Sequence, residues 1–201
     1  MARTRTFDEQ KALTDAMHVF WEKGYEACSL IDLTSRMGIQ KPSIYAAFGD
    51  KLSLFESALR HYNQLHAKAV RTKLTNNEGV KSAFRRLFME GVFPAATDER
   101  HGCFCINTMV ELAPHDPRFE VLTREHQRYL ATIFEDALQQ GINSGEIDGT
   151  VDCRAAAQSL VVAFIGITVL KKANPDRQWL ESCIDAALSI ISDAPKSINK
   201  S

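Results

Sequence analysis

The stretch SLIDLTSRMGIQKPSIYAAF, residues 29–48, predicts two short helices joined by a tight turn. Ser29 is a favourable N-cap residue, and Asp32 three residues later can accept a hydrogen bond from the backbone N–H of the cap. Gly38 stands where the first helix would end, because glycine adopts a positive φ at almost no steric cost. Pro42 fits the first turn of the second helix, where its missing N–H would have had no intrahelical partner.

The second of these helices has a polar outer face. Ile44 and Phe48 are four residues apart and are predicted to face inward. The groups left outside are a cation, a hydroxyl, a phenol and two methyl side chains, on Lys41, Ser43, Tyr45, Ala46 and Ala47. Such groups suit phosphate contacts, hydrogen bonds to base edges and apolar contact with a thymine methyl. On spacing alone, DNA binding and a structural helical hairpin fit the pattern equally well.

The residues around this stretch favour DNA binding. Gly24-Tyr25 ends a preceding amphipathic helix, and Phe48-Gly49-Asp50-Lys51 leads directly into another helix. From about Thr6 to about Tyr62 the chain resembles the DNA-binding domain of the TetR family of transcriptional regulators. The positions that carry the resemblance are Ile31-Asp32-Leu33, Gly38-Ile39, Ile44-Tyr45, Phe48, Lys51 and Leu54-Phe55.

The resemblance implies roles for individual residues. Ser29 and the turn after it would contact the DNA backbone, and Tyr45 and Lys51 would bind phosphates. The segment that enters the major groove would supply Gln40, Lys41, Pro42, Ser43, Tyr45 and Ala46. The family often has small or hydroxylic residues early in this helix, whereas here Pro42 removes a donor and Ala46 replaces a longer polar side chain. We therefore expect base readout to rest on few groups.

The rest of the chain predicts helices, with no strand of clean period-two alternation. Apolar residues recur at helical spacing in seven further segments, over 7–23, 52–74, 80–93, 103–113, 117–143, 155–170 and 177–192. The predicted fold is all-α, with an N-terminal three-helix helix-turn-helix head on a larger helical ligand-binding and dimerisation body. We assign the head to residues 6–66 and the effector-binding and dimerisation domain to residues 67–194.

Composition and charge place few limits on function. The chain has 201 residues, is 45% hydrophobic and carries a net charge of −1. Residues 1–72 carry ten basic against eight acidic side chains, which leaves fourteen against seventeen for the remainder. No secretion signal precedes Phe7, and the longest apolar run, Leu160–Leu170, is too short to span a bilayer. We therefore expect a cytoplasmic protein with no membrane partner.

The segment 155–170 is apolar on nearly every side. A helix of this kind in a soluble protein is expected to be buried all round, and a second subunit would bury it more easily than one chain. The sequence therefore predicts a homodimer formed through the last two helices.

An effector site is predicted in the body. Aromatic and methionine residues recur on predicted inward faces of three successive helices, at Phe84, Phe88, Phe104, Met109, Tyr129 and Phe134. A solid core would explain any one of them, but Asn107 in an otherwise apolar segment favours a pocket with a polar anchor. The resemblance implies a repressor that binds a palindromic DNA operator as a dimer and leaves it when a small-molecule effector enters the body.

The cluster His101-Gly102-Cys103-Phe104-Cys105 offers a different chemistry. Five cysteines, an odd number, argue against a disulfide framework. Metal binding is not expected, because Cys103 and Cys105 would point to different sides of a helix and no second ligand cluster has suitable spacing. Both could be small apolar core residues. Cys103 at a helix N-terminus is also a candidate effector-site thiol, and a redox- or electrophile-sensing regulator is the alternative function.

Catalytic motifs are missing from the sequence. It has no phosphate-binding glycine loop, no serine elbow, no recognisable carboxylate pair and no zinc-binding helix motif. We predict no enzyme activity and no cofactor. A helical enzyme using Cys103 and His101, and a purely structural helical adaptor, are the remaining alternatives.

Overall fold

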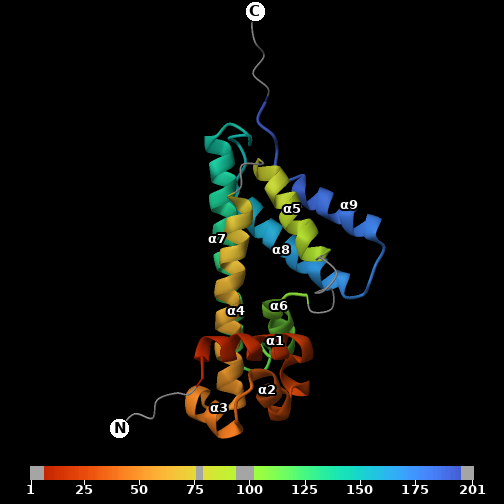
Figure 1. The fold of residues 1–201 in the computed structure, drawn as a ribbon. Coiled ribbons are helices and arrows are strands. Elements are labelled where there is room, and N and C mark those ends of the chain that lie inside the picture. The colour runs from red at the N-terminus through yellow and green to blue at the C-terminus, as the bar shows by residue number, and fades with distance from the viewer. Residues whose placement is uncertain (1–6, 76–78, 94–101, 196–201) are drawn as a thin grey trace, which may run out of the picture. The chain divides into compact units, whose positions relative to one another are not determined.

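The computed structural model describes residues 7–75, 79–93 and 102–195, and every element named within them is a helix (Figure 1). The helices are α1 (Glu9–Ala27), α2 (Leu30–Met37), α3 (Lys41–Phe48), α4 (Lys51–Leu74), α5 (Val80–Val92), α6 (Phe104–Glu111), α7 (Pro117–Asn143), α8 (Cys153–Lys171) and α9 (Arg177–Leu188). Among these residues the strand-like pairing is limited to one antiparallel bridge, between Ile147 and Asp193. The predicted all-α fold is confirmed.

The chain forms two compact units. The first contains the described residues up to 66 together with 103–124, and the second contains those of 67–102 together with 125–195. Helices α4 and α7 each contribute residues to both units. From the sequence we expect 103–124 in the body, whereas in the structure these residues pack with the head. Residue 66 as a functional boundary stays a prediction.

Phe55 of α4 lies at the centre of the first unit's core. Its ring makes edge contacts, at centroid distances of 4.8–5.4 Å, with Phe20, Tyr25, Phe104 and Phe119. Each such pair adds about 0.5–1.5 kcal/mol to the stabilisation from burial. Phe104 comes from α6 and Phe119 from the start of α7. These contacts explain why 103–124 belongs to the first unit.

Two aromatic pairs lie in the core of the second unit. Phe84 and Phe134 pack edge-on with centroids 5.0 Å apart, and Phe88 and Phe164 do so at 5.2 Å. All four rings are buried. They belong to α5, α7 and α8, and α4 and α9 also contribute buried residues to this core.

Aspartate side chains cap the N-termini of α7 and α8. The Asp152 side chain accepts the N–H of Ala155 at 3.0 Å at the start of α8, and Asp116 accepts the N–H of Arg118 at 2.9 Å at the start of α7. Gly24 interrupts α1, with φ 76° and ψ 177°, and one more helical turn follows it.

One face of α8 is exposed in the single chain. Val162 is 69% exposed, while Leu160 on the opposite side is fully buried. Within one chain, α5 and α9 pack on α8 and leave this face uncovered. Its burial by a second subunit stays a prediction. The helix has 19 residues, enough by length and composition to cross a membrane, whereas the apolar run 160–170 alone is too short. Burial of one side of α8 in the core of the second unit explains the apolar composition of the helix.

Candidate nucleic-acid interface

Helix α2 begins and ends as its sequence predicts. Ser29 is the N-cap, and the capping box is complete, because the Ser29 hydroxyl accepts the Asp32 N–H at 3.1 Å and Asp32 accepts the Ser29 N–H at 2.8 Å. Gly38 ends the helix with φ 66°, in the left-handed region. Leu33 and Met37 are buried beneath it. Helices α1, α2 and α3 lie around the first turns of α4 (Figure 1).

The Asp32 carboxylate is the centre of a small polar cluster. It accepts the Ser29 hydroxyl at 2.7 Å and the Lys23 ammonium at 2.5 Å. The hydrogen bond from Lys23 is the main reason why the pKa of Asp32 lies well below its usual range, and the two bonds from Ser29 add to it. Ser29 is exposed, as a contact to the DNA backbone requires, but its hydroxyl is already engaged in the cap.

Helix α3 turns its polar face to solvent. Its N-cap is Gln40, whose side chain makes no capping bond, and Pro42 lies in the first turn as predicted. Ile44 is fully buried and fixes the helix against the unit. The predicted DNA-contacting residues of this helix are exposed or, for Ser43, half-buried: Gln40, Lys41, Pro42, Ser43, Tyr45 and Ala46.

Within α3, Lys41 and Tyr45 lie one turn apart on the exposed face. The Lys41 ammonium is 5.6 Å from the centre of the Tyr45 ring, a cation–π distance, and 41% of Tyr45 is exposed. A cation and a phenol are thus presented together, beside the small methyl group of Ala46. The face offers few hydrogen-bonding groups, as the sequence led us to expect.

Lys51 lies differently from the way its proposed role suggested. Its ammonium donates to the backbone oxygen of Tyr25 at 2.6 Å and lies 4.3 Å from the centre of the Tyr25 ring. The side chain is half-buried. An ammonium has three donors, and one of them is committed here, so two remain for a phosphate. A phosphate contact by Lys51 stays a prediction.

The residues predicted to bind an effector divide between the two units. In the first unit, Cys103 and Phe104 are buried, and Asn107 and Met109 are half-buried. The Tyr62 hydroxyl donates to the Cys103 sulfur at 3.4 Å. Burial, reinforced by this thiol, raises the pKa of Tyr62 well above its ordinary value.

In the second unit, Phe84, Phe88 and Phe134 are core residues in edge contact with other rings. Tyr129 was expected on an inward face, yet it is 49% exposed. The inward stripe of α7 includes Leu130 and Phe134, and Tyr129 is turned about 100° away from Leu130 by the helix geometry. The effector role of all these residues stays a prediction.

Sequence reasoning missed a buried hydroxyl in α8. Thr168 is 4% exposed, and its Oγ1 has no hydrogen-bond partner among the described residues. An unsatisfied buried hydroxyl is costly and suits a site that is completed by a ligand. A lone threonine in an apolar run gives no sequence signal of this kind.

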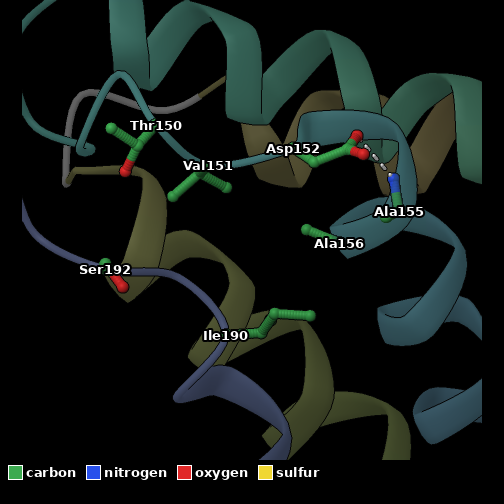
Figure 2. Close-up of a pocket in the computed structure, with 7 residues that line it drawn as sticks. All are labelled: Thr150, Val151, Asp152, Ala155, Ala156, Ile190 and Ser192. Carbon is green, nitrogen blue, oxygen red and sulfur yellow. Dashed lines mark hydrogen bonds between the residues drawn. The ribbon is translucent and has the colours of Figure 1, made fainter.

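A pocket in the second unit, of about 290 Å³, uses none of the predicted residues (Figure 2). It is lined by Thr150, Val151, Asp152, Ala155, Ala156, Ile190 and Ser192. Two of its polar groups already have partners, since Asp152 caps α8 and the Thr150 hydroxyl bonds to Asp148 at 2.7 Å. Over the described residues, no cluster of three or more His, Cys, Asp or Glu side chains is arranged to hold a metal ion. His101 lies outside the described residues.

Comparison with known proteins agrees with this geometry. Residues 12–58 match the family model described as bacterial regulatory proteins, tetR family, and residues 85–187 match the tetracyclin repressor-like C-terminal domain. The uncharacterized HTH-type transcriptional regulator YezE of Bacillus subtilis (strain 168) is 34% identical over 193 residues, which cover 95% of this chain and 100% of the relative. The HTH-type transcriptional repressor ComR of Escherichia coli (strain K12) is 30% identical, over 83% of this chain and 80% of that protein.

A solved structure is similar over nearly the whole chain. It is a cysteine mutant of the TetR family transcriptional regulator CifR, complexed with 26-base-pair double-strand operator DNA. The TM-score is 0.79 at 30% identity, with 94% of this chain and 100% of that chain covered. With a capped helix-turn-helix, an exposed polar face on α3 and matches to both halves, the chain belongs to the TetR family of DNA-binding transcriptional regulators.

Proposed function

We propose that the protein is a repressor that binds a palindromic operator as a dimer, with α3 in the major groove. The observation that carries this proposal is the exposed face of α3, where Lys41 and Tyr45 stand above the fully buried Ile44. The operator-bound state of CifR and the repressor function named for ComR support it. The same family membership favours a cytoplasmic protein without enzyme activity.

The predicted contact groups divide by chemistry. The cations Lys41 and Lys51 suit phosphates, as do the hydroxyls of Tyr45 and Ser29. Gln40 and Ser43 suit base edges. Pro42 and Ala46 offer only apolar contact, which suits the methyl group of a thymine. Specificity would therefore rest on one or two hydrogen-bonded bases together with thymine positions.

The exposed apolar side chains of the last two helices support dimerisation through them. Val162, Val169 and Leu170 on α8 and Trp179 on α9 are 40–69% exposed in the single chain. Because α8 and α9 pack against each other, we infer that these side chains contribute to one apolar surface, which is typical of protein–protein contacts.

We propose a small-molecule effector as the signal that releases DNA. Its candidate contacts in the second unit are Phe84, Phe88, Tyr129 and Phe134, and the buried Thr168 hydroxyl adds a polar one there. The other predicted residues, Cys103, Phe104, Asn107 and Met109, belong to the first unit and would form a separate site. To release the operator, the effector must bind the conformation with low DNA affinity more tightly than the other.

The test of the main proposal is selection from a random duplex library by the purified protein. We expect enriched sequences with two inverted half-sites, and their thymines should mark the apolar contacts of α3. Enrichment of single, non-repeated sites would contradict the dimeric operator, and no enrichment at low salt would contradict sequence-specific binding.

A thiol-sensing regulator is the second candidate function. The Tyr62 hydroxyl donates a hydrogen bond to the Cys103 sulfur at 3.4 Å, so a polar group lies beside this thiol. Operator affinity before and after mild peroxide, in the wild type and in Cys103→Ser, tests this role. Cys28→Ser is the matched control, because burial raises the pKa of the Cys28 thiol to about 11 and keeps it protonated. Release in the wild type and in Cys28→Ser, but not in Cys103→Ser, would favour the thiol mechanism.

A further inference from the structure

The carboxylate of Glu111, the last residue of α6, binds the backbone of α1 at its break. Its Oε1 accepts the N–H of Tyr25 at 3.0 Å and the N–H of Glu26 at 3.1 Å, and Oε2 accepts the Tyr25 N–H at 3.2 Å. These N–H groups begin the short helical turn after Gly24, where donors have no acceptor within the helix. Glu111 therefore caps this turn from a segment 85 residues away in the sequence.

Gly24 makes this contact possible in two ways. Its φ of 76° and ψ of 177° belong to a region that other residues adopt only with strain. A Cβ atom at this position would also lie 3.0 Å from Oε2 and 3.1 Å from Oε1 of Glu111. The glycine thus allows both the turn of the chain and the close approach of the carboxylate.

Lys51 holds the same peptide segment from another side. Its ammonium donates to the Tyr25 oxygen and packs on the Tyr25 ring. Tyr25 comes shortly before the α2 N-cap, and Lys51 follows α3 directly. The contact between them therefore joins the two ends of the segment that contains α2 and α3.

We propose that Glu111 is a positioning residue for DNA binding. It fixes residues 24–26. Through the contact of Tyr25 with Lys51, these residues in turn hold the two ends of the segment that contains α2 and α3. Glu111 contacts no DNA in this arrangement; it acts by keeping α3 in the orientation in which its exposed face enters the groove. The proposal rests on the DNA-binding function given above. It adds a residue of α6 that supports the DNA-binding helices without belonging to them.

The physical reason is the cost of losing the carboxylate. Without it, the N–H groups of Tyr25 and Glu26 lose a charge-assisted acceptor, and the strained backbone at Gly24 loses the contact that holds it. Groups that dock into a groove must be held to within about 0.5 Å. Loosening the segment that supports α2 and α3 therefore weakens the complex even when the unit stays folded.

The test compares Glu111→Ala with the conservative variant Glu111→Gln and with the control Glu120→Ala. Glu120 is an exposed carboxylate in the same unit, paired with Arg124 one turn along α7. The probe is a fluorescent duplex that the wild type selects from a random library, and affinity is measured well below the unfolding temperature. NMR hydrogen exchange of the Tyr25 and Glu26 amides reports the cap directly.

We expect Glu111→Ala to bind the duplex about tenfold more weakly and to exchange both amides faster. Glu111→Gln keeps an acceptor oxygen and should recover most of the affinity, and Glu120→Ala should match the wild type. Wild-type affinity in Glu111→Ala, despite fast exchange of the two amides, would overturn the proposal.

Two further results remain informative. If Glu111→Ala does not fold, Glu111→Asp replaces it, because the shorter side chain withdraws the carboxylate; weakened binding then supports the proposal and wild-type binding overturns it. A wild-type protein that selects no duplex contradicts the DNA-binding function itself, and this is seen before any variant is compared.

Discussion

Gly91 of α5 lies so close to Phe164 of α8 that a methyl group at Gly91 would come within 2.6 Å of the ring Cε2 and 2.7 Å of Cζ. The Phe164 ring also packs edge-on against Phe88 and is buried, so it has little room to move. Alanine favours a helix over glycine by about 1 kcal/mol, but we expect the steric overlap to win. Gly91→Ala should lower the free energy of unfolding by about 1–3 kcal/mol in urea denaturation at fixed protein concentration.

Gly149→Ala is the control for this change. Nothing lies within 4 Å of the position of a Cβ at Gly149, so its effect should stay within about 0.5 kcal/mol. Equal stability of the two variants would contradict the close packing of α5 on α8.

Asp32 should make the stability of the head depend on pH. Its bonds to Lys23 and Ser29 hold its pKa in the folded protein below the unfolded value. The stabilisation is therefore complete above the ordinary aspartate pKa of about 4 and is lost as the pH falls toward the lower folded value. Asp32→Asn, which cannot ionise, should be less stable near neutral pH and lose less stability on acidification. Urea denaturation over a series of pH values checks this, and parallel curves for the two proteins would contradict it.

Lys41 and Lys51 should give different results when each is replaced by alanine. Lys41 is exposed on α3, so Lys41→Ala should weaken DNA binding and reduce the salt slope by about one unit, with the free energy of unfolding unchanged. Lys51→Ala should weaken DNA binding and also lower the free energy of unfolding, because it removes the contacts with Tyr25. Gel-shift titrations at several salt concentrations, together with urea denaturation, separate the two effects.

Lys68→Ala is the control for these lysine variants, since it removes the same charge from an exposed position in the second unit. A Lys41→Ala protein that behaves like Lys68→Ala would show that the face of α3 does not meet DNA.

Thr168→Val should stabilise the ligand-free protein. Valine has nearly the same shape, and it removes a buried hydroxyl that has no partner among the described residues. The free energy of unfolding should rise by about 1 kcal/mol. A loss of stability instead would mean that the hydroxyl is bonded, for example to buried water.

The local structure of the head could be predicted from sequence because each feature depends on near neighbours. The Ser29–Asp32 box, the left-handed Gly38 and the buried Ile44 are all fixed within a few residues. Capping and helical periodicity describe such short-range interactions directly. The same holds for the exposed face of α3, which follows from the burial of Ile44.

The placement of α6 in the first unit could not be predicted in this way. It depends on the packing of Phe104 on Phe55 and on the hydrogen bonds that the Tyr25 N–H donates to Glu111, and no periodic pattern relates residues so far apart. A glutamate at a helix end usually indicates a solvated side chain. For the same reason, the residues predicted to line one effector site fall in both units.

Val162→Glu should convert the protein from a dimer to a monomer. Val162 is 69% exposed in the single chain and lies on the same face of α8 as the exposed Val169, two turns further on. If this face is covered by a second copy, the new carboxylate becomes a buried, unpaired charge, at a cost of roughly 3–5 kcal/mol. Val110→Glu is a closely matched control, because Val110 is 67% exposed but lies on α6 in the first unit. Sedimentation equilibrium at micromolar concentration should find dimers of the wild type and of Val110→Glu, and monomers of Val162→Glu. A monomeric wild type, or a dimer that tolerates Val162→Glu, would place the contact between subunits away from this face.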